Sequence, residues 1–85
     1  MTQAVTDPQQ YFYLHEGGAL TSLDELAQAL PQMRPEVFAH HVNEQKHDFS
    51  AWVRGVMGER ELARSMARAR TKEQLARAIF IHRFR

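Results

Sequence analysis

The segment VFAHHVNEQKHDFSAWV, residues 37–53, holds the only Trp and three of the five His of this chain. Two apolar faces recur at helical spacing in and just after this segment, first at Val37, Phe38, His41 and Val42 and then at Phe49, Trp52, Val53 and Val56. Pro35 suits the first turn of the earlier helix, where its missing N–H costs nothing. Asp48 is a good N-cap for a second helix over residues 49–57, which Gly58 would end. We expect a structural core built from Phe38, His41, Phe49 and Trp52.

Two interpretations of the polar residues 43–47 between these helices remain open. They form a loop, or the chain continues as a single bent helix over residues 35–57. In the bent helix, three potential ligands share one face and could hold a divalent cation, namely His40, Glu44 and His47. Because Asp48 indicates a helix start, we favour the loop, with no metal and no cofactor. His41 then packs in the core with a backbone hydrogen bond.

The residues that precede this segment predict a short extended element. Residues 1–10 are polar, contain Pro8 and show no periodicity, so we expect a flexible tail. Residues 11–15, with the sequence YFYLH, are rich in strand formers and lead towards Gly17-Gly18, a pair typical of a β-hairpin turn. Such a hairpin is marginal alone and should lie across helices.

Three more helices are predicted from capping signals and apolar spacing. Ser22 with Glu25 and Thr71 with Gln74 are typical capping boxes, and residues 59–68 carry both glutamates of that helix in its first turn. The expected buried residues are Leu23, Leu26, Ala27 and Leu30, then Leu62, Ala63 and Met66, and finally Leu75, Ala76, Ile79 and Phe80. Residues 79–84 alternate in polarity, so a strand beside the N-terminal element is the alternative for that stretch. The predicted fold is mainly α: a compact bundle of four to five short helices with an N-terminal extended segment or β-hairpin, in one domain over residues 11–85.

Charge divides the chain into two unlike parts. Residues 1–50 carry two basic against seven acidic residues, a net charge of −5, whereas residues 51–85 carry nine basic against three acidic residues, a net charge of +6. This polarity suits pairing between the parts, association of two copies or contact with an acidic partner. The chain has no Cys, no apolar run long enough for a membrane span and no signal-peptide pattern at its start. We expect a cytoplasmic protein with no membrane partner.

The sequence offers no arrangement typical of catalysis. Its serines are explained by capping and helix surfaces, and the two adjacent glycines lack the pattern of a phosphate loop. We therefore predict that the protein is not an enzyme. Nucleic-acid binding through the basic C-terminal half is the alternative function, with Arg64 and Arg68 as candidate phosphate contacts.

The order of these motifs resembles a family of small uncharacterised prokaryotic helical domains. The shared pattern reads F-x-GG, SLxEL, VFxHHV, DFxxWV and GxxxLA, and here it falls on Phe12, Gly17 or Gly18, Leu23, Leu26, Leu30, Phe38, His41, Val42, Asp48, Phe49, Trp52, Gly58, Leu62 and Ala63. The resemblance covers residues 11–67. It implies a shared fold and no established activity, so it transfers no functional residue.

A chain this short can hide only a small core, and several large apolar residues are left over. We predict a non-enzymatic protein-interaction or assembly module that self-associates as a homo-oligomer or binds a protein partner. The expected contact residues are Tyr11, Phe12, Tyr13, Ile81 and Phe84.

Overall fold

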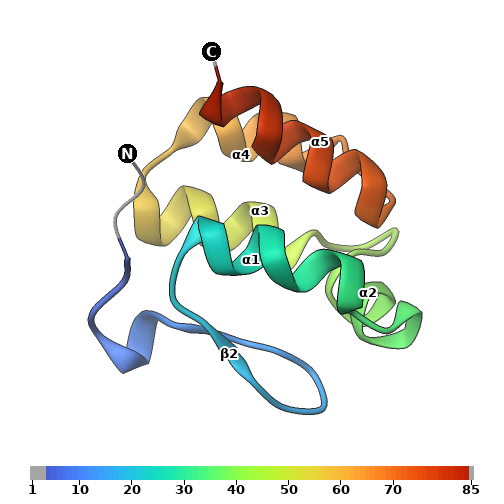
Figure 1. Ribbon diagram of the computed structural model, residues 1–85, viewed down its shortest axis with the longest axis horizontal. Helices are drawn as coiled ribbons and strands as arrows, with labels where there is room; N and C mark the ends of the chain where they lie inside the picture. The colour runs from blue at the N-terminus through green and yellow to red at the C-terminus, as the bar shows by residue number, and fades with distance from the viewer. Residues whose placement is uncertain (1–3, 85) are drawn as a thin grey trace.

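Five α-helices and a two-stranded hairpin make up residues 4–84, the part of the chain that the computed structural model describes (Figure 1). The helices are α1 (Leu23–Ala29), α2 (Pro35–His41), α3 (Asp48–Trp52), α4 (Arg60–Ala67) and α5 (Lys72–Arg83). The strands are β1 (Phe12–Tyr13) and β2 (Ala19–Leu20), and three further turns are the 3-10 helices η1 (Pro8–Gln10) and η2 (Leu30–Gln32) and the π-helical η3 (Val53–Met57). The predicted mainly α bundle with a short N-terminal hairpin is confirmed.

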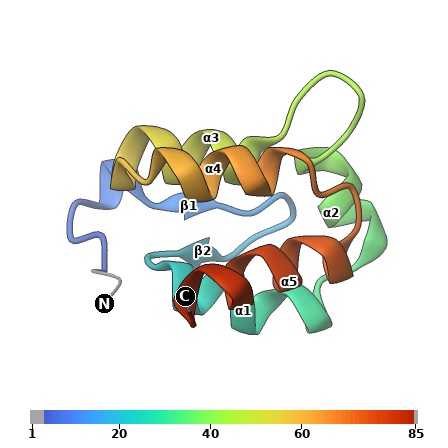
Figure 2. The ribbon, with the colours of Figure 1, turned by 90° about the horizontal axis from the view of Figure 1, so that it is seen from above.

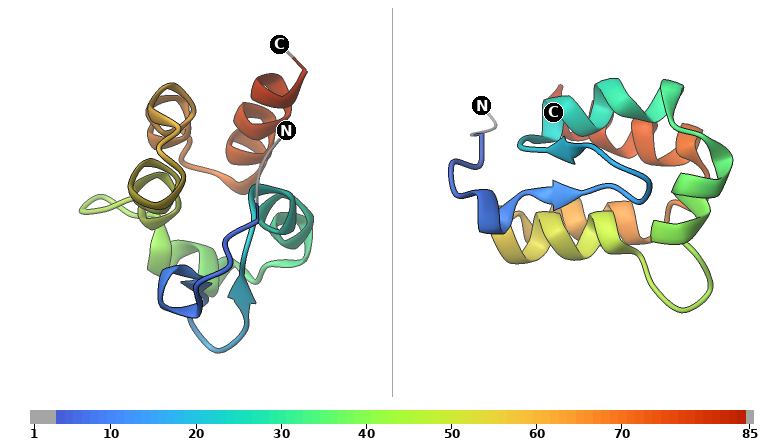
Figure 3. Two further views of the ribbon diagram at one scale, coloured as in Figure 1. Left: turned by 90° about the vertical axis from the view of Figure 1, so that its left-hand side faces the viewer. Right: turned by 90° about the horizontal axis from the view of Figure 1, so that it is seen from below.

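The helices are arranged as two pairs with the hairpin below them. Seen end-on, α4 lies over α3 on one side and α5 lies over α1 on the other (Figure 3). In the view from below, β1 runs along α3 and β2 lies beside α1, so the hairpin closes the gap between the pairs (Figures 2 and 3). Within residues 4–84, no helix combines the length and the apolar composition that crossing a bilayer would require.

The hairpin forms where Gly17-Gly18 predicts it, through a wider turn than a two-residue one. Phe12 pairs with Leu20 in antiparallel register, and the Leu14 N–H donates to the Gly18 carbonyl at 2.9 Å. Glu16, Gly17 and Gly18 all have positive φ, at 73°, 120° and 94°. Two glycines in succession accept this backbone freely, whereas Glu16 adopts it under strain.

Both predicted capping boxes begin helices, with one shared difference. The Glu25 N–H donates to Ser22 Oγ at 3.1 Å, while the Glu25 carboxylate accepts from the N–H of Thr21, one residue before the cap. At α5, Thr71 Oγ1 accepts from the Gln74 N–H at 3.0 Å, and the Gln74 side-chain oxygen accepts from the N–H of Arg70, again one residue before the cap. Since α5 is helical to Arg83, the alternative strand over residues 79–84 is wrong.

Residues 43–47 separate two helices, so the single bent helix over residues 35–57 is also wrong. Val42 and His47 form an isolated antiparallel bridge across this loop. The predicted cap is wrong by one position, because Asp48 is the first helical residue of α3 and His47 Nδ1 accepts the Ser50 N–H at 3.2 Å. The helix then continues through η3 and ends at Gly58, whose φ of 70° is left-handed.

The core lies between the two helix pairs and the hairpin. Phe38, His41, Phe49 and Trp52 are all buried, and Phe49 is 0% exposed. Phe12 from β1 joins them: its ring stacks on that of Phe49, with the centroids 4.6 Å apart, and meets the rings of His41 and Trp52 edge-on.

The described part of the N-terminal segment, residues 4–10, lies against the domain instead of forming a loose tail. The Val5 N–H donates to the Thr21 carbonyl at 2.6 Å, and Asp7 caps η1 by accepting from the Gln9 N–H. Trp52 Nε1 donates to the Gln10 carbonyl at 2.8 Å. The fold therefore begins before residue 11; residues 1–3 lie outside the described residues.

Candidate functional site

The predicted contact residues do not form one surface. Phe12 is 8% exposed within the core, so its assignment as a contact residue is wrong. Tyr11 and Tyr13 belong to the hairpin side of the molecule, where the Tyr13 hydroxyl donates to the Pro8 carbonyl at 2.6 Å. Ile81 and Phe84 lie at the end of α5, on the opposite side (Figure 1). A hairpin and a helix end so far apart cannot contact one partner face together.

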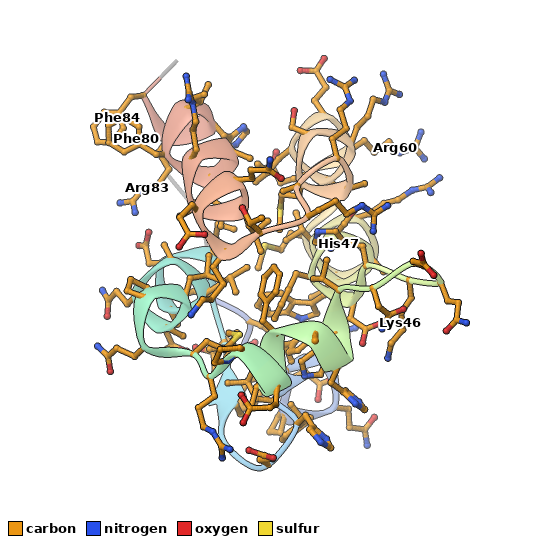
Figure 4. The ribbon with its side chains drawn as sticks, turned by 90° about the vertical axis from the view of Figure 1, so that its right-hand side faces the viewer. Lys46, His47, Arg60, Phe80, Arg83 and Phe84 are labelled. Carbon is orange, nitrogen blue, oxygen red and sulfur yellow. The ribbon has the colours of Figure 1, made fainter. Side chains whose placement is uncertain are left out.

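The last two turns of α5 carry an exposed apolar cluster, here called the α5 apolar patch: Phe80, Ile81 and Phe84. Their exposed fractions are 60%, 48% and 70%. The rings of Phe80 and Phe84 lie against each other with centroids 4.7 Å apart, as Figure 4 shows at one edge of the molecule. The expectation that Phe80 faces the core is wrong, because α5 docks through Leu75 and Ile79, and Phe80 is turned about 100° from Ile79 around the helix.

Charged residues of both signs flank the α5 apolar patch. Arg83 Nη1 lies 2.7 Å from Asp24 Oδ1 of α1 on one side. His82 Nε2 lies 3.8 Å from Glu59 Oε1, just before α4, on the other. All four side chains are partly exposed. The cluster is thus an apolar centre within a rim that contains both acids and bases.

A groove between α4 and α5 continues from this patch. It has a volume of about 290 Å³, and Ile81 forms part of its wall. The other lining residues are apolar Leu62, Ala69 and Ala78 and polar Ser65, Arg68, Gln74, Arg77 and His82. The apolar surface on this side of the molecule therefore extends beyond the helix end into a concave region.

His41 is held on both ring nitrogens. Its Nδ1 lies 3.0 Å from Asp48 Oδ2, and its Nε2 accepts the His15 N–H at 2.9 Å, which makes Nδ1 the donor. Asp48 also accepts from Lys46 Nζ at 2.9 Å. Partial burial alone would raise the pKa of Asp48, but the hydrogen bonds from His41 and Lys46 outweigh it and the pKa lies below its usual value. With both nitrogens engaged, the ring, which belongs to α2, joins the hairpin turn to the start of α3.

The three residues that would have formed a metal site are separated by the loop. His47 is used internally, since its Nε2 lies 3.1 Å from the Ala69 carbonyl and its Nδ1 caps α3. The exposed ring of His40 instead stacks on that of His15, with centroids 3.9 Å apart. Within residues 4–84, no three His, Asp or Glu side chains converge in a way that could hold a metal ion.

The neutral cap at His47 predicts a pH dependence of stability. Burial lowers the pKa of His47 below its ordinary value of 6.5, against the opposing effect of the bond to Ala69. In the unfolded chain this His protonates near pH 6.5, while the folded state resists protonation. The free energy of unfolding should therefore fall as the pH is lowered from about 7.5 through 6.5 to about 5.5.

Urea unfolding at these pH values tests this expectation, with His47→Asn as the comparison. Asn can still accept the Ser50 N–H but does not titrate in this range. The variant should lose part of the slope below pH 6.5. Equal slopes in both proteins would contradict a neutral, buried His47.

The two candidate nucleic-acid contacts are both exposed but line different grooves. Arg68 lines the groove between α4 and α5, whereas Arg64 lines a second groove towards α3. Arg54 and Arg60 share that second groove, and the sequence did not single out Arg54. Arg54 lies in η3, and it comes beside α4 only because the two elements pack together.

Comparisons with family models, with curated proteins and with solved structures give no match. The resemblance of the sequence pattern to small prokaryotic helical domains therefore stays a prediction.

Proposed function

We propose that this protein is a non-enzymatic assembly module that associates with a second copy of itself through the α5 apolar patch. One observation carries the proposal: Phe80, Ile81 and Phe84 are 48–70% exposed, although 18 other apolar residues within residues 4–84 are buried. Large aromatic side chains dominate the energy of interfaces when they become desolvated. A contiguous apolar patch with a polar rim is the usual form of a protein contact surface.

The rim supports a second copy as the occupant. In a two-fold dimer the same patch faces itself, so its charges must complement their own rotated image. Asp24 beside Arg83 and Glu59 beside His82 supply an acid and a base on each side of the patch. Antiparallel packing of two α5 helices would bring Phe80 and Phe84 of each copy together and set acidic residues against basic ones.

The assignment as a non-enzyme rests on how the polar residues are used. His41 and His47 each have both ring nitrogens within hydrogen-bond distance of a partner in the fold. Ser50 Oγ donates to the Ala63 carbonyl, so this buried hydroxyl serves packing between α3 and α4. These groups hold elements together. We expect the module to act in the cytoplasm.

Replacing both Phe80 and Phe84 with Ser should weaken self-association by about 2 kcal/mol or more, roughly thirtyfold in the dissociation constant. The reason is that the variant removes the two aromatic anchors without touching the buried face of α5. Sedimentation velocity over a wide range of protein concentration measures the change.

Tyr13→Ser is the matched control, because Tyr13 is 59% exposed but belongs to the hairpin. It should associate as the wild type does. A wild type that stays monomeric at every concentration, or a control that weakens association as much as the double variant, would show that the α5 apolar patch is not a self-association surface.

A further inference from the structure

A second groove, lined by arginines, lies between α3–η3 and α4. Its lining residues, here called the arginine groove, are Ser50, Arg54, Arg60, Ala63, Arg64 and Ala67. The volume is about 290 Å³. Nothing in the proposed assembly role uses this surface.

Small residues form the floor of the groove and arginines stand around it. Ser50 and Ala63 are buried, and the Ser50 hydroxyl donates to the Ala63 carbonyl at 2.7 Å, which holds the two helices close. Arg54, Arg60 and Arg64 are exposed and reach the groove from both helices. A guanidinium presents a planar fork of donors that matches phosphate oxygens.

The positive charge of the groove is not balanced within the fold. Among the ion pairs formed within residues 4–84, none includes Arg54, Arg60 or Arg64. The two acidic residues next to Arg60 in sequence, Glu59 and Glu61, do not line the groove. Three uncompensated cations around one hollow repel one another, and a bound anion would relieve that repulsion.

We infer that the arginine groove binds the phosphate backbone of nucleic acid, without reading the bases. Arg60 and Arg64 are about 6 Å apart along the helix axis, close to two charge steps of one DNA strand at ~3.4 Å each. The groove has no aromatic residue on which a base could stack and no Asn or Gln that would read a base edge. Recognition through charge alone predicts binding that is independent of sequence and sensitive to salt.

The arginine groove and the α5 apolar patch lie on separate flanks. Figure 4 shows Arg60 at one edge of the molecule and Phe80 with Phe84 at the opposite edge. A nucleic acid in the groove would therefore leave the patch free. The two surfaces can be tested one at a time.

Fluorescence anisotropy with a short labelled DNA duplex tests the groove. Three phosphate contacts predict a slope near about −2.7 in log affinity against log salt, or about 40-fold weaker binding between about 50 and about 200 mM salt. In the variant Arg60→Gln with Arg64→Gln, one contact remains, so the same salt change should weaken binding only about 4-fold. The Phe80→Ser, Phe84→Ser variant should keep the wild-type salt dependence.

The charge-matched control is Arg34→Gln with Arg77→Gln, since neither residue lines the groove. It should bind as the wild type does. Equal losses in both double variants, or no duplex binding at about 50 mM salt, would overturn the inference. Displacement of the duplex by pyrophosphate at the same phosphate concentration would also overturn it and assign the groove to a compact anion.

Discussion

Replacing Trp52 with Ala will lower the free energy of unfolding by about 3–5 kcal/mol, a loss that leaves a domain of this size largely unfolded. Trp52 is 8% exposed, and its ring meets Phe12 edge-on at 5.6 Å between centroids. Its indole N–H also donates to the Gln10 carbonyl. One side chain therefore joins α3, β1 and the N-terminal turn, and its removal leaves a cavity where all three meet.

Urea unfolding followed by far-ultraviolet circular dichroism measures this loss, and Trp52→Phe separates its two causes. Phe keeps an aromatic ring against Phe12 but cannot donate to Gln10. It should cost about 1 kcal/mol for the lost hydrogen bond, plus a smaller packing term. If Trp52→Ala were no more costly than Trp52→Phe, the indole ring would not be a central part of the core.

His41→Ala should destabilise the fold by roughly 2–4 kcal/mol, through lost packing and the loss of two hydrogen bonds. The ring is 5% exposed and lies against Phe12 and Phe49. Without it, the His15 N–H loses its acceptor, and Asp48 keeps only Lys46 as a side-chain partner. The hairpin would then be joined to α3 mainly through Phe12.

The neighbouring histidine supplies the control for this experiment. His40 is exposed; its ring stacks on His15 and meets His41 edge-on, with no hydrogen bond from its side chain within residues 4–84, so His40→Ala should change stability by less than about 0.5 kcal/mol. Chemical denaturation at neutral pH compares the two variants. Similar losses in both would mean that the hydrogen bonds of His41 do not hold the hairpin in place.

Local signals predicted most of the helices correctly, because their causes lie within a few residues. Ser22 and Thr71 cap α1 and α5 through bonds to backbone groups three residues away. The cap of α3 was misplaced by one residue for a tertiary reason. His47 can serve as the cap because its other nitrogen is held by Ala69, 22 residues further along the chain.

The surfaces were harder to predict, since they depend on how each helix is rotated against its neighbours. The apolar spacing of α5 fits a buried stripe centred on either Ile79 or Phe80. Contact with α1 and α4 buries Ile79 and leaves Phe80 exposed. We expected Phe12 on the surface, because no signal within a few residues of it shows that the hairpin lies beneath α3. The partnership of Arg54 with Arg60 and Arg64 likewise arises only when α3 and α4 pack.

The π-helical turn η3 sets the phase between the two halves of the bundle. A π turn accommodates one residue more than an α turn, so α4 would start about 100° further around if the same residues adopted regular α geometry. Deleting Gly55, where an added Cβ would meet open space, would remove the extra residue, and the turn could then become regular while α4 keeps its rotational position. Without that deletion, a regular turn would swing the guanidinium groups of Arg60 and Arg64 away from Arg54, so the π geometry of η3 keeps the three arginines aligned.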